Sequence, residues 1–374
     1  MHQLPPAQPG MRETDVETPA LILDLDAFEF NLDTMARTVA GTRVKLRPHA
    51  KTHKCPVVAQ LQMRRGAIGQ CVQKIAEAEA MAWGGVNDIL VTNEIVDPRK
   101  LARLAALSSI AQVAVSVDSL KHITLIEAAA QAAGIRMSAL IEIDVGAGRC
   151  GVAPGAEAVE LARHIANSRH LAFAGLQAYH GTAQHLRSAA DRRQAIGKAI
   201  LACEQTVEAL SRSRIPCGIV SGGGTGTFEL EAASGVYTEL QVGSYCFMDG
   251  DYAANLEEDG QPFGLFQHSL FVLASVMSTT KPGLAVLDAG HKAVAIERGL
   301  PTVWQQPELR IVSAADEHAR MEYPPALAAP ELGERFRLVP RHCDPTVDRF
   351  DWYVCVRAGR VESVWPITAR GGMQ

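Results

Sequence analysis

Between residues 44 and 250, short runs of apolar, often β-branched residues alternate with longer stretches rich in Ala and Leu. The longer stretches repeat apolar residues at helical spacing, as at Ala76, Ala80, Met81 and Trp83. The short runs have the length of buried strands. We predict eight strands, within residues 44–50, 68–73, 88–95, 113–119, 137–146, 171–181, 217–224 and 238–247.

Eight consecutive strand-helix units are typical of a (β/α)8 TIM-type barrel, an α/β fold, and we assign residues 26–250 to it. A doubly wound parallel sheet is the competing architecture. After residue 251 helical periodicity fades. The runs at residues 269–279, 285–288, 309–314, 335–339 and 352–365 predict a smaller, mostly antiparallel β domain over residues 251–374.

Two details complete this predicted β domain. In its last run, Ala358 and Gly359 separate two alternating segments, which predicts a hairpin. The segment 18–25 precedes the barrel, and we expect it to pair with the β domain because a lone strand is not stable.

Composition and charge restrict the class of partner. Hydrophobic residues make up 47% of the 374 residues and charged residues 21%, with a mean hydropathy of +0.03, as in globular proteins with a large core. Thirty-six Lys and Arg against 41 Asp and Glu leave a net charge of -5, with no basic block. These values disfavour nucleic acid and anionic membranes and favour a small-molecule partner.

The sequence predicts a cytoplasmic protein. Residues 1–10 lack the positive and apolar regions of an export signal. The most apolar window, residues 269–277, is far shorter than the roughly 20 residues that cross a bilayer. The eight cysteines are spread singly without a C-x-x-C pair, which fits reduced thiols.

Reactive groups gather at the end of the first predicted strand, in the segment RPHAKTHK at residues 47–54. A lysine at the mouth of a barrel can lose its proton when desolvated beside other cations, and then form a Schiff base with a carbonyl. Lys51 is the candidate for this chemistry. A solvated basic loop is the alternative interpretation.

Glycines follow the seventh and eighth predicted strands, in SGGGTG at residues 221–226 and in GSY at residues 243–245. Barrels often bind phosphate with these two loops, because glycine lets backbone amides approach the oxygens. Tight turns without a ligand are the alternative. Neither G-x-G-x-x-G nor G-x-x-x-x-G-K-[ST] fits the chain. A lysine and a phosphate site together indicate pyridoxal phosphate, an aldehyde that carries a phosphate.

Other polar residues follow the fifth and sixth strands. Arg149 could face the pyridine nitrogen of such a cofactor, and Tyr179 could lie against its ring. Both could also be ordinary polar residues of the barrel rim. Far downstream, His342 and Asp344 lie two residues apart. In an extended segment they would share one face, with Cys343 on the other, and could hold manganese, cobalt or zinc.

Together these segments resemble the D-threonine aldolase family, which is grouped with alanine racemase and D-serine dehydratase. The resemblance rests on RPHAKTHK, RCGV at 149–152, QAYHG at 177–181, GGGTG at 222–226, YTELQVGSYCFMDGDY at 237–252 and PRHCDPT at 340–346. It runs in matching order from about residue 18 to residue 371. It implies a barrel followed by a β domain, a homodimer, pyridoxal phosphate and a divalent metal, typically manganese, with cobalt, magnesium and zinc as alternatives.

The resemblance also implies roles for individual residues. Lys51 matches the Schiff-base lysine, Arg149 the partner of the pyridine nitrogen, and His185 the base for the substrate hydroxyl. His342 and Asp344 match the metal pair; the dehydratase branch carries His-x-Cys instead of His-x-Asp, and Cys343 is one residue too early for that pattern. The cofactor pocket is matched by Tyr179, Gly224, Thr225, Gly243, Ser244 and Tyr245.

We therefore expect a lyase that cleaves D-β-hydroxy-α-amino acids, with D-threonine giving glycine and acetaldehyde. The nearest alternative is a dehydratase acting on D-serine or D-threo-3-hydroxyaspartate. A racemase on the same scaffold would need no metal. A non-catalytic pyridoxal phosphate carrier is the alternative from another class, and the β domain and the metal motif weigh against it.

Overall fold

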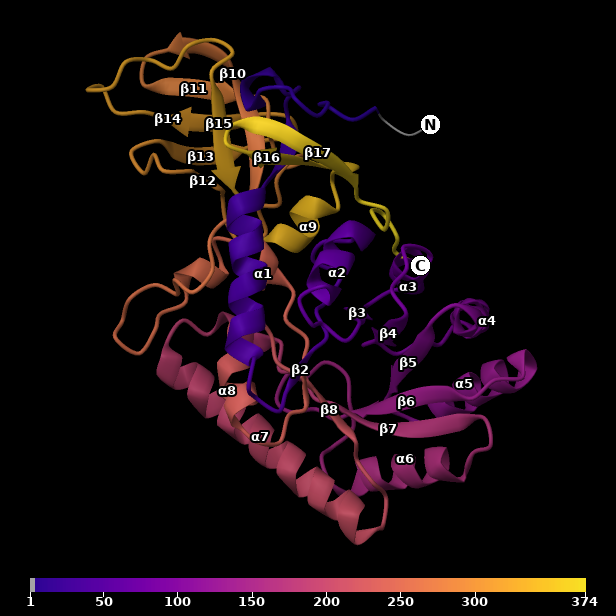
Figure 1. Ribbon diagram of the computed structural model, residues 1–374. Coiled ribbons are helices and arrows are strands. Elements are labelled where there is room, and N and C mark those ends of the chain that lie inside the picture. The colour runs from indigo at the N-terminus through magenta and orange to yellow at the C-terminus, as the bar shows by residue number, and fades with distance from the viewer. Residues whose placement is uncertain (1–3) are drawn as a thin grey trace.

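The computed structural model describes residues 4–374, so the first three residues of the segment inspected for an export signal lie outside it. The chain forms an eight-stranded parallel sheet and a nine-stranded, mostly antiparallel sheet. In Figure 1 the antiparallel sheet lies at the top and the curled parallel sheet with its helices below. The predicted fold class, a barrel followed by a β domain, is confirmed.

Each strand of the parallel sheet lies within one predicted run. The spatial order is β2-β9-β8-β7-β6-β5-β4-β3. A parallel bridge between His49 and Cys71 joins the two ends of this sheet. The strands are β2 (Lys45–Leu46), β3 (Gln70–Val72), β4 (Asp88–Val91), β5 (Gln112–Val117), β6 (Met137–Glu142), β7 (Leu171–Gln177), β8 (Ile219–Gly222) and β9 (Glu239–Leu240).

Helices connect these strands and bury their apolar side against the sheet. Local signals fix their ends: Ser119 accepts a hydrogen bond from His122 N–H at the start of α5, and Gly134 ends it at a φ of 66°. The helices are α1 (Leu25–Val39), α2 (Pro56–Met63), α3 (Ile75–Trp83), α4 (Pro98–Ala106), α5 (Leu120–Ala133), α6 (Ala156–Asn167), α7 (Ala189–Arg212) and α8 (Phe228–Ala233).

The antiparallel sheet has the order β13-β14-β11-β10-β1-β16-β17, with β15 joining β10 to β12. Strand β1 lies between β10, to which it is antiparallel, and β16, to which it is parallel. The strands are β1 (Ala20–Asp24), β10 (Leu270–Lys281), β11 (Leu284–Leu287), β12 (Thr302–Val303), β13 (Arg310–Ala314), β14 (Ala319–Glu322), β15 (Arg335–Val339), β16 (Trp352–Arg357) and β17 (Arg360–Pro366).

The hairpin predicted at Ala358 and Gly359 is confirmed. Both residues have positive φ values, of 47° and 72°, which a tight two-residue turn between β16 and β17 requires. Strands β12 and β14 were missed: β12 has only two residues, and β14 reads ARME, with little strand character.

One hydrophobic core spans the junction of the two sheets. It contains Phe28 of α1, Leu240 of β9 and Tyr353 of β16. The ring of Phe28 lies 6.2 Å from those of Phe247 and Trp365. Because this core is continuous, the end of the barrel is held firmly beside the β domain. No helix within residues 4–374 has the length and apolarity of a bilayer-spanning segment, and all eight cysteines are free thiols.

Candidate active site

Lys51 lies in the turn that follows β2. Ala50 N–H donates to Cys71 O at 2.8 Å and Lys54 N–H donates to Ala50 O at 2.7 Å, which fixes the turn on both sides of Lys51. Lys51 Nζ lies 2.7 Å from Oδ2 of Asp344. We expected cationic neighbours that lower the pKa of Lys51. The structure instead places an anion there, and the negative charge of Asp344 raises this pKa above its ordinary value.

A cavity of about 200 Å³ opens beside Lys51 at the carboxyl ends of the barrel strands. Its wall is formed by loops that follow several different strands, so residues far apart in sequence meet there. From the predicted site it is lined by Lys51, Arg149, Tyr179, Gly224, Thr225, Gly243 and Ser244, and it is completed by His49, Thr52, Gln73, Thr92, Gln177, Gln241 and Tyr252.

The glycines of this wall are required by close packing. A Cβ atom on Gly243 would lie 2.4 Å from Oγ1 of Thr52, and one on Gly224 would lie 2.5 Å from Oε1 of Gln184. Only glycine therefore lets the two segments run along the cavity, where backbone amides can face a phosphate. A lysine amine in the cavity and bare backbone in its wall fit pyridoxal phosphate.

Tyr245 differs from its neighbours in this set, because its side chain does not line the cavity. Its ring is buried and lies 5.7 Å from that of Phe266. Its backbone N–H donates to Oγ1 of Thr225 at 3.1 Å. Tyr245 thus supports the cavity wall through Thr225 and through the core.

Tyr179 and Arg149 lie on the wall formed by the loops after β7 and β6. Burial raises the pKa of the Tyr179 hydroxyl, so this group is neutral and can donate a hydrogen bond. The half-exposed Arg149 side chain approaches Glu142, with 3.5 Å between a guanidinium nitrogen and Oε1. Both positions suit a flat aromatic ligand with a basic nitrogen.

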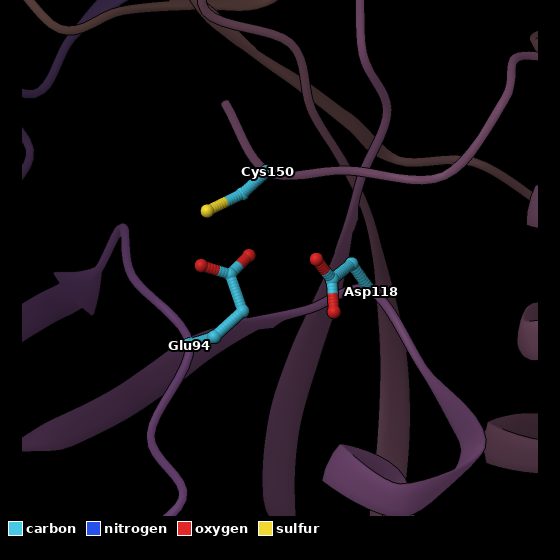
Figure 2. A group of neighbouring side chains, drawn as sticks. All are labelled: Glu94, Asp118 and Cys150. Atoms are coloured by element: carbon cyan, nitrogen blue, oxygen red, sulfur yellow. The ribbon is translucent and has the colours of Figure 1, made fainter. Parts of the chain in front are cut away.

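Acidic groups gather behind Arg149 (Figure 2). The carboxylates of Glu94 and Asp118 and the thiol of Cys150 place atoms within 4.8 Å of one another. Burial, followed by the neighbouring Glu94, raises the pKa of Glu142 to about 8. Within residues 4–374, buried oxygens of Glu94 and Glu142 have no hydrogen-bond partner. Part of this cluster therefore holds protons at neutral pH, and the remainder balances the charge of Arg149.

The predicted metal pair does not lie on a strand, so the expected extended segment is wrong. His342 precedes the short helix α9 (Cys343–Val347), and Asp344 lies in its first turn. Pro345 is tolerated there because the first turn needs no N–H from it, and the Thr346 hydroxyl donates to His342 O at 2.8 Å. A helical turn replaces the predicted strand for these local reasons.

The two side chains nevertheless belong to one electrostatic site. Burial opposes ionisation of Asp344, but Lys51 and His342 outweigh it and hold the pKa of this carboxyl well below its usual range. Among the described residues, the buried Oδ1 of Asp344 has no hydrogen-bond partner. His342 Nδ1 lies 2.5 Å from Oε1 of Glu297. A carboxylate oxygen without a partner and a nearby imidazole fit a divalent metal.

Cys343 lies between the two and faces away from them. Its N–H donates to Oδ2 of Asp249 at 3.1 Å, and its buried sulfur lies 4.0 Å from Met248 O within the core. The expectation that Cys343 points away from His342 and Asp344 agrees with this arrangement.

His185 ends a 3-10 turn (Thr182–His185) that follows β7. It is adjacent to the cavity and is not part of its lining. Its ring packs against that of Tyr252, 5.4 Å between centroids, and Tyr252 lines the cavity. Nδ1 of His185 lies 2.6 Å from Oδ2 of Asp251.

Several cavity residues were missed. Gln73 and Thr92 follow β3 and β4, so inspection of every strand end would have found them. They form a polar network, because Gln73 Nε2 donates to Oγ1 of Thr92 at 3.0 Å and His49 Nε2 lies 3.1 Å from the same oxygen. Tyr252 lies beyond the last barrel strand, and no pattern marks it.

Comparison with known proteins agrees with this architecture. The family "Alanine racemase, N-terminal domain" matches residues 23–251, and a serine dehydratase domain family matches residues 269–356. A D-threonine aldolase from Arthrobacter sp is 46% identical over 98% of this chain and 96% of its own. A 3-hydroxy-D-aspartate aldolase from Paracoccus denitrificans (strain Pd 1222) is 45% identical, covering 98% of this chain and 95% of its own.

A solved structure gives the same result for the fold. The crystal structure of D-threonine aldolase from Filomicrobium marinum has a TM-score of 0.96 and 45% sequence identity, and the match covers 99% of this chain and 100% of that one. The chain therefore belongs to the D-threonine aldolase family of alanine racemase-like enzymes.

Proposed function

We propose that this protein is a pyridoxal phosphate- and divalent metal-dependent aldolase that cleaves D-β-hydroxy-α-amino acids, converting D-threonine to glycine and acetaldehyde. The distance of 2.7 Å between Lys51 Nζ and the Asp344 carboxylate carries this proposal, because it places an amine for the cofactor and a ligand for the metal within reach of one small substrate. Membership of the D-threonine aldolase family supports it.

The cavity residues divide the work of holding the cofactor. Lys51 supplies the amine that binds the cofactor aldehyde, and the backbone at Gly224 and Gly243, with the hydroxyls of Thr225 and Ser244, surrounds its phosphate. Arg149 faces the pyridine nitrogen and Tyr179 lies against the ring. When bound, pyridoxal phosphate supplies an electron sink for cleavage at Cα, and the metal lowers the pKa of a coordinated hydroxyl.

His342 and Asp344 hold the metal. An imidazole and a carboxylate suit manganese best among the candidates, with cobalt, magnesium or zinc as alternatives. The oxygen of Asp344 that lacks a partner within residues 4–374 is available for this ion without loss of an existing hydrogen bond. His342 also contacts Glu297, which orients the imidazole.

His185 removes the proton of the substrate β-hydroxyl. The O–H electron pair then forms the carbonyl of the aldehyde, and the Cα–Cβ pair stays with the fragment that is protonated and leaves as glycine. Tyr252 separates the His185 ring from the cavity, so its side chain controls how the hydroxyl approaches this base.

The same geometry disfavours a dehydratase. In that branch a cysteine replaces the aspartate of the metal motif, whereas here Asp344 faces Lys51 and the sulfur of Cys343 lies in the core. We further propose that the enzyme is a homodimer of the cytoplasm, where its free thiols remain reduced.

Product analysis tests the proposed reaction. Purified holoenzyme is incubated with D-threonine and, separately, with 3-hydroxy-D-aspartate, and glycine, aldehyde, ammonia and keto acid are quantified. Equal amounts of glycine and aldehyde are expected. Ammonia with a keto acid would show a dehydratase, and cofactor absorbance without turnover would show a carrier.

A further inference from the structure

A buried carboxylate lies directly behind the predicted base. Oδ2 of Asp251 is 2.6 Å from Nδ1 of His185, and the Asp251 residue is only 4% exposed. Its other carboxylate oxygen accepts a hydrogen bond from the guanidinium of Arg187. Asp251 therefore contacts His185 and Arg187 with separate oxygens, and both contacts come from the segment that follows β7.

Asp251 is held by its backbone as well as by its side chain. Its N–H donates to Arg341 O at 3.1 Å, in the residue that precedes His342. Arg187 donates to Asn255 Oδ1 at 2.8 Å, and Asn255 in turn donates to the backbone oxygen of Gln184 at 2.9 Å. The turn that carries His185 is thus tied to the segment that leaves the barrel.

The chemistry of this contact fixes the proton on His185. Burial opposes ionisation of Asp251, but the hydrogen bonds from His185 and Arg187 outweigh it and keep the pKa of this carboxyl well below its usual range. An ionised carboxylate only accepts hydrogen bonds, so Nδ1 of His185 must be the donor. In the neutral imidazole this leaves Nε2 as the basic nitrogen.

We infer that Asp251 is a positioning residue that holds His185 in the Nδ1–H tautomer and fixes its ring beside Tyr252, so that Nε2 is the atom that takes the proton of the substrate hydroxyl. This inference rests on the proposed function for its role in catalysis. The pairing itself is a property of the two side chains and can be tested without a substrate.

Asp251→Asn is the variant that tests this inference. The amide keeps the shape of the carboxylate but can donate to Nδ1, which favours the other tautomer. We expect kcat on D-threonine to fall about 100-fold with KM within threefold of the wild type. Asp251→Glu, which keeps the charge and the acceptor, should recover part of kcat. Asp316→Asn is the matched control, because Asp316 pairs at 2.7 Å with His291 on the exposed β domain, and it should leave kcat unchanged.

Nitrogen-15 NMR of histidine-labelled holoenzyme gives the readout that does not depend on activity, with His185 assigned from the spectrum of His185→Gln. The wild type should show a protonated Nδ1 and an unprotonated Nε2, and Asp251→Asn should move the proton towards Nε2. A wild-type His185 protonated on Nε2 would overturn the inference, even if Asp251→Asn failed to fold. A folded Asp251→Asn variant with wild-type kcat and tautomer would also overturn it.

These results separate the inference from the proposed function. Wild-type enzyme without aldolase products would refute the proposed function, whereas the tautomer of His185 would still decide whether Asp251 orients it.

Discussion

Lys51 and Asp344 are 293 positions apart in the chain, and their side chains form an ion pair of 2.7 Å at the mouth of the barrel. The first belongs to the turn after β2, and the second to the short helix α9 inserted before β16. The barrel thus supplies the lysine and the β domain supplies the carboxylate. The candidate active site exists only because the common core holds these two parts together.

Replacement of Lys51 should abolish cofactor attachment. In Lys51→Ala no amine remains to bind the cofactor aldehyde, so we expect loss of the protein-bound cofactor absorbance and a fall in activity of at least about 1,000-fold. Absorbance spectroscopy of the dialysed protein measures the first effect. Lys45→Ala is the control, because Lys45 is exposed on β2 and should keep the full spectrum. A normal spectrum in Lys51→Ala would exclude Lys51 as the attachment site.

Replacement of Asp344 should remove the metal and leave the cofactor. Asparagine cannot supply the anionic oxygen, so in Asp344→Asn the Kd for manganese should rise at least about tenfold and activity should fall about 100-fold. Calorimetric titration measures the Kd, and absorbance shows whether the cofactor stays. Asp259→Asn, in an exposed loop, provides the comparison. Unchanged manganese affinity in Asp344→Asn would place the metal elsewhere.

The packing around Gly243 predicts a defect in cofactor affinity. The Cβ of Gly243→Ala would meet Thr52 at 2.4 Å, so the segment after β9 has to shift away from the cavity. We expect the Kd for pyridoxal phosphate to rise about tenfold, a loss of about 1.4 kcal/mol. In Gly218→Ala the nearest atom lies 3.6 Å away, and this variant should bind as the wild type does. Equal affinities of the two variants would contradict the prediction.

Glu231 on α8 predicts a pH dependence of stability. Burial raises its pKa from 4.5 to about 7, so the folded protein binds this proton more tightly than the unfolded chain. Stability should therefore fall as pH rises from about 4.5 to 7 and stay lower above pH 7.

Glu231→Gln removes this titration. The free energy of unfolding of the wild type relative to the variant should decrease by about 2 to 3 kcal/mol between pH 5 and pH 8, as measured by urea denaturation. The exposed Glu160→Gln should show no such change. A difference between wild type and Glu231→Gln that stays constant with pH would refute the prediction.

The sequence was most informative where physical constraints are local. Buried parallel strands read as continuous apolar runs, and so every barrel strand lay within its predicted run. The glycines beside Gly224 and Gly243 were found because only glycine fits close to a neighbouring segment. The segment at His342 was predicted as a strand because the spacing of two ligands was considered and the tolerance of Pro345 for a first helical turn was not.

Contacts between distant segments were not predictable from the chain. Nothing near Lys51 indicated that Asp344 would be its partner, and the cationic surroundings expected from the local sequence were therefore wrong. The pairing of His185 with Asp251 likewise depends on two loops that meet only in the folded structure. Tyr252 enters the cavity for the same reason.

The central claim is that the lysine and the metal pair act together on a D-configured substrate. The most direct measurement follows acetaldehyde release from D-threonine and L-threonine by chelator-treated holoenzyme, with and without added manganese, while cofactor absorbance is recorded. We predict acetaldehyde from D-threonine alone, only after manganese is restored, with the absorbance of bound cofactor present throughout. Release of ammonia and 2-oxobutyrate, or acetaldehyde formation that is indifferent to manganese, would contradict the account.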